Sequence, residues 1–238
     1  MRLPILMYHR VGPRPRNARR PRMYVSPEQF GAQLAALKSW GYETIAFGDW
    51  LAYLAGAGAL PRRPIIVTFD DGYASLFDVA FPLLRSNGYR ATVFLVSDLI
   101  GKTNAWDSDE PQEPLLDAPQ IAQMQAAGIA FESHTRTHAP LTTIPIEQAR
   151  DEMMLSKHAL ERLLGTRVRV LCYPYGKENA GIRALARDAG YEAAVIARRR
   201  MNTTRTDPFR LVRIGVDHRT SVAELRRTLF WLRWLHWA

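Results

Sequence analysis

The chain alternates between short apolar runs and longer segments in which apolar residues recur about every 3.6 positions. The runs have the length of buried strands, whereas segments such as the one containing Phe30, Leu34 and Leu37 predict amphipathic helices. This alternation favours βαβ units around a parallel sheet. No fixed-period repeat or low-complexity linker interrupts residues 1–238, so we expect one domain. The predicted strands are Pro4–Tyr8, Ile65–Phe69, Thr92–Val96, Ile129–Phe131, Val168–Tyr173, Ala193–Ile196 and Leu211–Ile214.

Three helices have specific signals. Ser26-Pro27-Glu28-Gln29 combines a capping residue, a proline at the first helical position and a glutamine within reach of the cap. A second helix is predicted by apolar spacing, with a face formed by Met154, Leu155, His158, Leu160 and Leu163. The third is a Trp/Arg-rich C-terminal helix at about 221–237, in which Leu225, Leu229 and Leu232 share the face expected to cover the sheet.

The composition gives broad limits. With 47% hydrophobic residues the chain can bury a full core, and no run reaches the roughly 18 apolar residues of a membrane span. No signal peptide is evident, so we expect a cytoplasmic location. The single Cys172 excludes an internal disulfide framework. The net charge of +9 leaves a basic nucleic-acid-binding protein as one hypothesis.

Polar or titratable residues follow several predicted strands directly. They are His9 after Tyr8, Asp70-Asp71 after Phe69, His134 after the strand at Phe131, and Tyr175 after Tyr173. In parallel β/α barrels the loops at this end of the strands converge on one site. The sequence therefore predicts a common site at the mouth of a barrel.

Asp70, Asp71 and Gly72 form the first candidate motif, in which the glycine permits a tight turn. Two adjacent carboxylates repel each other unless a cation neutralises one of them. The pair is therefore either a turn cap or one metal ligand beside one free base.

His134 and His138 form the second candidate motif. Histidines four residues apart lie on one face of a helical turn and can share a metal ion. Thr135 stands where a zincin protease needs glutamate, so that mechanism is excluded. The two histidines and one aspartate would give the three ligands and open position of a catalytic zinc, leaving the other aspartate as a base.

Residues 68–73, 133–138 and 173–176 resemble, in this order, the first three motifs of the polysaccharide deacetylases, carbohydrate esterase family 4. The resemblance implies a distorted (β/α) barrel that removes N-acetyl groups from amino sugars with a divalent metal ion, usually Zn²⁺. It assigns the general base to Asp70 and the metal to Asp71, His134 and His138. The backbone N–H of Tyr175 would stabilise the oxyanion.

Further expectations concern the substrate and the general acid. Trp106, Tyr73 and Arg136 are expected to contact substrate, with a solvated side chain as the alternative for Arg136. Most family members have arginine at the position of Cys172, where we expect a buried thiol instead. The early Met-Tyr-His, as in poly-N-acetylglucosamine deacetylases, favours His9 as the acid. A loosely matching late motif leaves His218 as the other candidate.

We therefore expect an N-deacetylase acting on a polysaccharide or on a lipid-linked glycan. The alternatives are another carbon–nitrogen or ester hydrolase on the same metal site, or the nucleic-acid-binding protein, which would leave the Asp and His pairs without a role. The C-terminal helix is expected to pack on the barrel and form a dimer contact, or to touch a membrane surface through its Trp and Arg residues. The sequence does not fix the oligomeric state.

Overall fold

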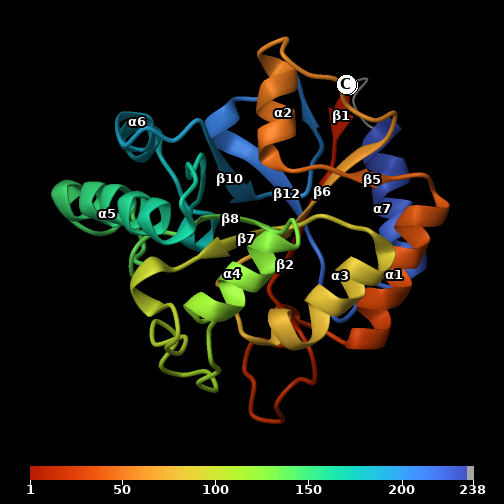
Figure 1. Ribbon diagram of the computed structural model, residues 1–238, viewed down its shortest axis with the longest axis horizontal. Coiled ribbons are helices and arrows are strands. Elements are labelled where there is room, and N and C mark those ends of the chain that lie inside the picture. The colour runs from red at the N-terminus through yellow and green to blue at the C-terminus, as the bar shows by residue number, and fades with distance from the viewer. Residues whose placement is uncertain (235–238) are drawn as a thin grey trace.

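The computed structural model describes residues 1–234; residues 235–238 lie outside the description. Within that range, seven parallel strands close into a barrel that helices surround (Figure 1). The ring runs β2-β12-β10-β9-β8-β7-β6 and closes where β2 pairs with β6. The expected distorted (β/α) barrel is confirmed, and each predicted run overlaps one of its strands. These are β2 (Ile5–Tyr8), β6 (Pro64–Phe69), β7 (Thr92–Leu95), β8 (Ala130–Ser133), β9 (Val170–Cys172), β10 (Ala193–Ala197) and β12 (Leu211–Gly215).

Short strands extend the barrel at its ends. β5 (Glu43–Thr44) pairs with the start of β6, and β1 (Arg2–Leu3) pairs antiparallel with β11 (Asn202–Thr203). β3 (Arg10–Val11) pairs with β4 (Tyr24–Val25), which brings the two ends of an N-terminal loop together.

The longer helices cover the outside of the barrel. The predicted cap is present, since Ser26 Oγ accepts a hydrogen bond of 3.2 Å from the Gln29 backbone N–H at the start of α1. These helices are α1 (Pro27–Ser39), α2 (Phe47–Leu54), α3 (Phe81–Asn87), α4 (Ala118–Ala126), α5 (Ile146–Leu164), α6 (Ala180–Asp188) and α7 (Val222–Trp234).

Helix α5 has the predicted location but a different buried face. Leu155 and Leu163 are 40% and 41% exposed, whereas Met153 and Leu160 are fully buried. The predicted face was therefore wrong in part. Spacing near 3.6 residues is compatible with neighbouring rows of one helix, and packing against the barrel selects between them.

Side-chain alternation along the strands determines which residues point into the barrel. Ile66, Phe94 and Val170 belong to one apolar cluster, together with Cys172 and Leu211. Cys172 lies two residues after Val170, and Arg213 lies two residues after Leu211. Both side chains therefore point inward near the carboxyl ends of their strands.

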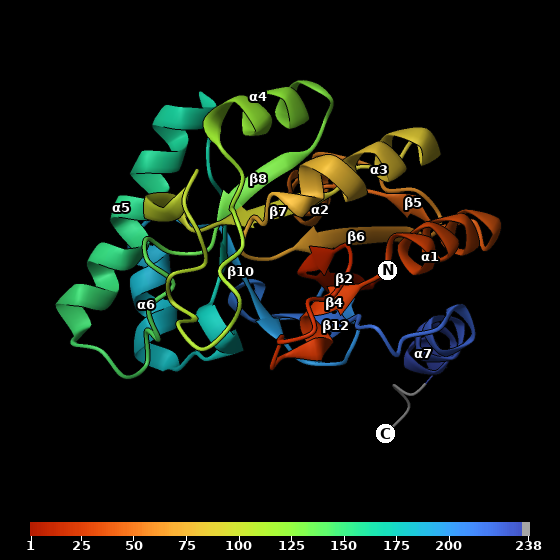
Figure 2. The same cartoon turned by 90° about the horizontal axis from the view of Figure 1, so that it is seen from below.

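Helix α7 lies beside α1 at the edge of the molecule (Figure 2). Leu225 and Leu229 are buried and Leu232 packs against the core, which agrees with the predicted face. The end of the helix predicted at about 237 falls outside the described residues. None of the helices within residues 1–234 has the length and apolar character needed to cross a bilayer.

Candidate active site

The strand ends converge on one cavity of about 220 Å³. Its lining includes residues from β2, β6, β8, β9, β10 and β12 or the loops that follow them, together with the loop after β7 and the connection between β3 and β4. The predicted residues that it contains are His9, Asp70, Asp71, Trp106, His134, His138 and Tyr175. The common site expected at the barrel mouth therefore forms.

Asp71, His134 and His138 have the geometry of a metal site. Asp71 Oδ1 lies 3.4 Å from His134 Nε2 and 3.5 Å from His138 Nε2. Ligand atoms about 2.0–2.1 Å from a tetrahedral zinc ion are about 3.4 Å apart, so these separations match the edges of such a site. All three residues are buried, and the donor set of one carboxylate and two imidazoles fits a divalent metal ion.

His134 is oriented by the backbone of the neighbouring strand. Its Nδ1–H donates a hydrogen bond of 2.8 Å to the carbonyl oxygen of Cys172. With the proton on Nδ1, the lone pair of Nε2 points toward Asp71 and is free to bind a metal.

His138 is held between two aromatic rings. Trp106 stacks on it with the ring centroids 4.6 Å apart, and Tyr175 meets it edge-on at 4.8 Å. Burial is the main cause that lowers the pKa of His138 to about 3, which keeps the ring in the neutral form that binds metals.

The two histidines are joined by an irregular loop, so the helical turn predicted for them was wrong. Thr135 and His138 both have positive φ, at 66° and 65°. Glu152 on α5 stabilises this loop by accepting backbone N–H bonds from Arg136 and Thr137, at 3.0 and 2.8 Å.

Left-handed backbone is concentrated in the three motifs. Among the described non-glycine residues, those with positive φ are Asp71, Thr135, His138 and Tyr175. Such conformations cost about 1–3 kcal/mol each and persist only where the surrounding structure enforces them. These strained residues lie in the turns that carry the candidate site residues, so the turns set the directions of those side chains.

Asp70 is held by an arginine that the sequence did not suggest. Arg213 Nη1 and Nη2 donate to Asp70 Oδ1 and Oδ2 at 2.5 and 2.7 Å, and both side chains are buried. Burial alone would raise the pKa of Asp70, but the Arg213 charge and its hydrogen bonds lower it below the usual value. Arg213, on β12, thus supplies beside Asp70 the positive charge that Cys172 on β9 lacks.

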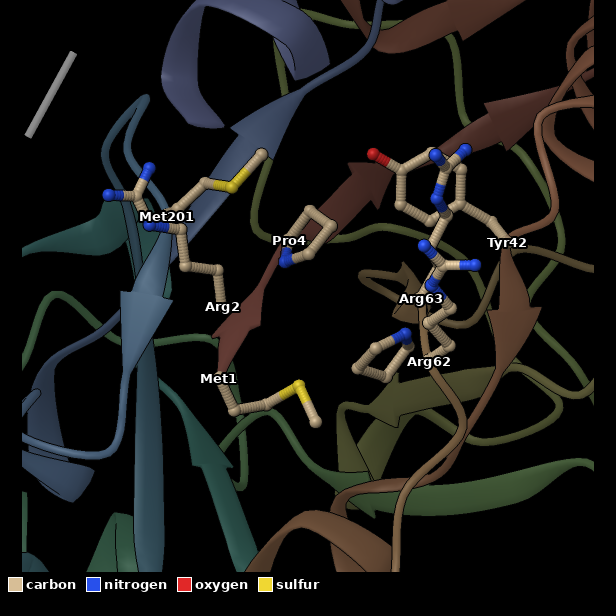
Figure 3. A pocket seen from close by; sticks show the side chains of 8 residues that line it. Met1, Arg2, Pro4, Tyr42, Arg62, Arg63 and Met201 are labelled. Carbon is tan, nitrogen blue, oxygen red and sulfur yellow. The ribbon is translucent and has the colours of Figure 1, made fainter. Parts of the chain in front are cut away.

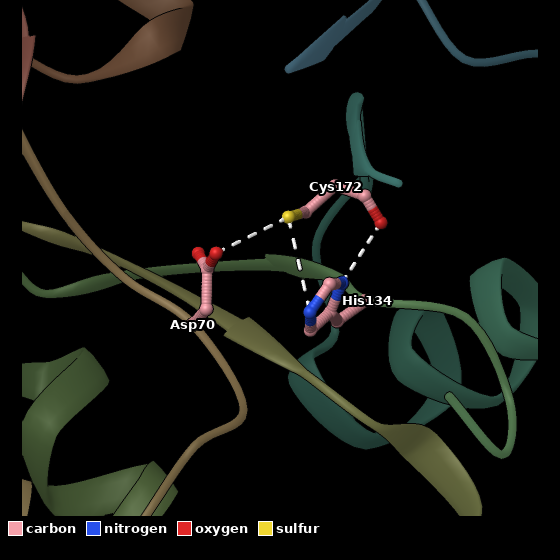
Figure 4. A group of neighbouring side chains, drawn as sticks. All are labelled: Asp70, His134 and Cys172. Carbon is pink, nitrogen blue, oxygen red and sulfur yellow. Dashed lines mark hydrogen bonds between the residues drawn. The ribbon is translucent and has the colours of Figure 1, made fainter. Parts of the chain in front are cut away.

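Cys172 is fully buried, as expected, and borders both Asp70 and His134 (Figure 4). Its Sγ lies 3.6 Å from Asp70 Oδ2 and 3.9 Å from His134 Nε2. This trio is a poor metal site because both Asp70 oxygens bind Arg213, whose Nη2 lies 3.1 Å from the sulfur. The guanidinium charge would repel a cation there, so Asp71, His134 and His138 are the better ligand set.

The two candidate acids lie in different places. His9 Nε2 is 3.8 Å from Asp70 Oδ2 inside the cavity, whereas His218 is exposed in a turn and does not line it. Burial lowers the pKa of His9, and the carboxylates of Asp70 and Asp71 oppose this effect.

Tyr73 and Arg136 do not line the cavity. Tyr73 is fully buried, and the Arg10 guanidinium lies 3.8 Å from its ring centroid. Arg136 is partly exposed and donates to Asp98 at 2.6 Å. Of the three expected substrate contacts, the structure thus places Trp106 in the cavity.

A second cavity, of about 290 Å³, lies at the opposite end of the barrel where β1 and β6 begin. Figure 3 shows Arg2 directed to one side of Pro4, with Arg62 and Arg63 on the other side. These arginines do not converge on a common ligand position.

Comparisons of the sequence with known proteins point to one family. The family model described as polysaccharide deacetylase matches residues 57–194. YxkH of Bacillus subtilis is 29% identical over 194 residues, which cover 82% of this chain and 64% of YxkH. A Staphylococcus epidermidis poly-β-1,6-N-acetyl-D-glucosamine N-deacetylase is 28% identical over 204 residues, covering 82% of this chain and 68% of that protein.

The fold comparison covers nearly the whole chain. The deacetylase PplD of Streptococcus pyogenes superposes with a TM-score of 0.84 and 24% identity, over 96% of this chain and 98% of that one. This likeness concerns the fold, and it extends the match to the N-terminal and C-terminal strands that the family model leaves out.

Proposed function

Because this chain belongs to the polysaccharide deacetylase family, we propose that it is a metal-dependent hydrolase that removes N-acetyl groups from an N-acetylated sugar. The observation that carries the proposal is the contrast between two adjacent carboxylates. Asp71 faces two imidazoles and Asp70 is held by Arg213. One carboxylate is suited to bind a metal and the other to accept a proton.

The metal ligands in this proposal are Asp71, His134 and His138, and the ion is Zn²⁺. The mixed carboxylate and imidazole set, with nearly tetrahedral spacing, is typical of catalytic zinc. A divalent ion bound there supplies the Lewis acidity that polarises the acetamide carbonyl and makes water more acidic.

The protein side chains then move the protons. Asp70 accepts a proton from the attacking water, with its carboxylate oriented by Arg213. The Tyr175 backbone N–H donates to the developing oxyanion. His9, whose Nε2 lies 3.8 Å from Asp70 Oδ2, donates a proton to the departing amine.

The proposed substrate is a polysaccharide or a lipid-linked glycan that carries N-acetylglucosamine. The name of the Staphylococcus epidermidis relative supports this sugar. Trp106 would border the acetyl group, because it lines the cavity and stacks on His138. Tyr73 and Arg136 would act on substrate indirectly, through the loops that they support.

The exposed face of the C-terminal helix α7 supports contact with a membrane surface. Phe230 and Trp231 of α7 are 56% and 53% exposed, and the exposed Arg226 and Arg227 lie one turn before them. Aromatic and basic side chains on one helix face favour contact with an anionic membrane surface, where a lipid-linked sugar would be found. Arg233, Trp234 and Trp237 were expected to take part in this contact, but their side chains lie outside the described part of the structure. The cytoplasmic location stays a prediction.

The test is acetate release from β-1,6-linked N-acetylglucosamine oligomers, measured together with the metal content of the protein. We expect about one divalent ion per chain and activity that a chelator abolishes and Zn²⁺ restores. His134→Ala and His138→Ala should each lose both metal and activity. Wild-type metal occupancy in the His138→Ala protein would contradict the ligand assignment, and hydrolysis of other amides or esters alone would favour the alternative hydrolase.

A further inference from the structure

Two loops that are distant in sequence meet at the rim of the catalytic cavity. The first joins β3 to β4 and contains Arg20; the second follows β7 and contains Trp106 and Asp107. Arg20, Trp106 and Asp107 all line the cavity. Arg20 Nη1 and Asp107 Oδ1 form an ion pair of 2.6 Å, with the Asp107 side chain 4% exposed and that of Arg20 43% exposed.

Several further contacts hold this ion pair in place. The Arg19 backbone N–H donates to Glu110 Oε2 at 3.1 Å, which fixes the loop directly beside Arg20. Arg10 Nε lies 2.9 Å from Glu113 Oε1, between the bases of the same two loops. The pair is therefore preorganised, so that a ligand would not have to order it on binding.

The ion pair keeps unused hydrogen-bonding capacity on both side chains. Arg20 makes a hydrogen bond through Nη1, while its Nη2 and Nε are 3.8 Å from Asp109 Oδ1 and 3.9 Å from Glu110 Oε1. Within the described residues, Asp107 Oδ2 accepts no hydrogen bond. A donor on Arg20 and an acceptor on Asp107, held side by side by the ion pair, match the vicinal hydroxyl groups of a sugar, each of which both donates and accepts.

The ion pair also lies next to a residue that contacts a proposed metal ligand. Trp106 precedes Asp107 and stacks on His138 at 4.6 Å. An acetamide carbonyl directed at the metal ligands would place the attached sugar ring beside Trp106, toward the rim where Arg20 and Asp107 lie. The half-exposed Tyr175 would border the same ring from the other side of His138.

We propose that Arg20 and Asp107 form the binding subsite for the hydroxyl groups of the sugar whose N-acetyl group is hydrolysed. This inference rests on the proposed function, and it assigns sugar recognition to a pair of rim residues that the three sequence motifs do not include.

The experiment compares two substrates in the full-length, metal-loaded protein. One is a β-1,6-linked N-acetylglucosamine oligomer, and the other is p-nitrophenyl acetate, which has an acetyl group but no sugar hydroxyls. For Arg20→Gln and Asp107→Asn, we expect the ratio of kcat/KM for the oligomer to kcat/KM for the aryl ester to fall about 10- to 100-fold, mainly through KM. This corresponds to about 1.5–3 kcal/mol for a hydrogen bond to a charged group.

Arg90→Gln is the matched control, since it breaks an ion pair of 2.8 Å with Asp49 that is also partly exposed but does not line the cavity. It should leave the ratio at the wild-type value. An equal loss on both substrates would show that the pair only supports the loops, and an unchanged ratio would likewise overturn the proposal. If the wild-type protein hydrolyses the aryl ester but releases no acetate from the oligomer, it is the proposed function that fails.

Discussion

Asp70 and Asp71 are neighbours in sequence, yet their carboxylates face different partners. Asp70 follows β6 in line with the strand, and its carboxylate meets Arg213. Asp71 has φ of 74°, so the chain turns sharply between the two residues. This turn lets both carboxylates line the same cavity, the proposed base facing Arg213 and the proposed ligand facing the imidazoles, whereas in a regular strand the two side chains would point to opposite faces.

The two carboxylates should therefore respond differently to the same substitution. Asp70→Asn should keep its metal but lose roughly 10²–10⁴-fold in turnover, the usual contribution of a general base. Asp71→Asn should lose metal affinity first, since an amide is a weaker ligand than a carboxylate. Metal analysis and acetate release on both variants check this, and identical behaviour would mean that the roles are divided wrongly.

Arg213 should control the pH dependence of Asp70. A base works in its deprotonated form, so activity is lost as the pH falls through the pKa of Asp70. Arg213 lowers that pKa. Arg213→Gln should raise it and move the acid limb of the kcat/KM profile to higher pH, with metal retained; Arg213→Lys, which keeps the charge, should move it less. An unmoved acid limb in a folded Arg213→Gln protein would assign the base elsewhere.

His9 should determine the alkaline limb. A histidine that acts as an acid must be protonated, so activity is lost as the pH rises through its pKa. Burial lowers the pKa of His9 below its ordinary value. His9→Ala should lower turnover and flatten this limb, whereas the exposed His218→Ala should leave it intact. The opposite result would restore the late histidine as the acid.

At the scale of elements, the site depends on tight turns that follow the strands and pack closely against neighbouring strands. Gly176 ends the turn after β9 with φ of 64°, and a Cβ there would lie 3.0 Å from both the backbone N and the Cβ of Ala197 on β10. Because β10 cannot move away without breaking the barrel, Gly176 keeps the preceding Tyr175 beside His138.

Gly176→Ala should therefore destabilise the protein by about 1–3 kcal/mol, the usual cost of enforced left-handed backbone. It should also lower activity, since Tyr175 would shift. Urea unfolding and acetate release measure the two effects. Gly56→Ala is the control, with a similar φ of 74° but no atom within 4 Å of the added Cβ. It should share the stability loss and keep the activity, and equal activity loss in both would contradict this role for Gly176.

The sequence predicts elements better than it predicts side-chain partners. All seven barrel strands follow from apolar runs, because strands buried on both faces need continuous apolar sequence. Arg213 was not predicted, since nothing local in Leu211–Ile214 shows that its third residue points at Asp70 across the barrel. The irregular loop at His134 and the outward position of Arg136 likewise depend on contacts with Glu152 and Asp98, which are distant in sequence.

At the scale of the whole molecule, part of the positive charge is neutralised by carboxylates at the rim of the site. Arg19 and Arg20, in the densest arginine cluster of the sequence, are paired with Asp107, Asp109 and Glu110. The rim of the site is thus nearly balanced in charge. On α7, by contrast, Arg226 and Arg227 are exposed, and the salt bridges within residues 1–234 do not include them.

This difference makes α7 the surface to test for membrane contact. Each Lys or Arg near an anionic bilayer contributes about 1 kcal/mol, so Arg226→Gln with Arg227→Gln should weaken liposome binding about 30-fold. Phe230→Ser with Trp231→Ser should weaken it as well, and salt should reduce wild-type binding. Leu155→Ser with Leu163→Ser is the control, because both side chains are similarly exposed on α5. Co-sedimentation with vesicles containing phosphatidylglycerol measures the effect. Unchanged binding in the α7 variants would exclude this surface, and a dimer that dissociates in them would show that the exposed aromatic pair contacts a second copy of the chain instead.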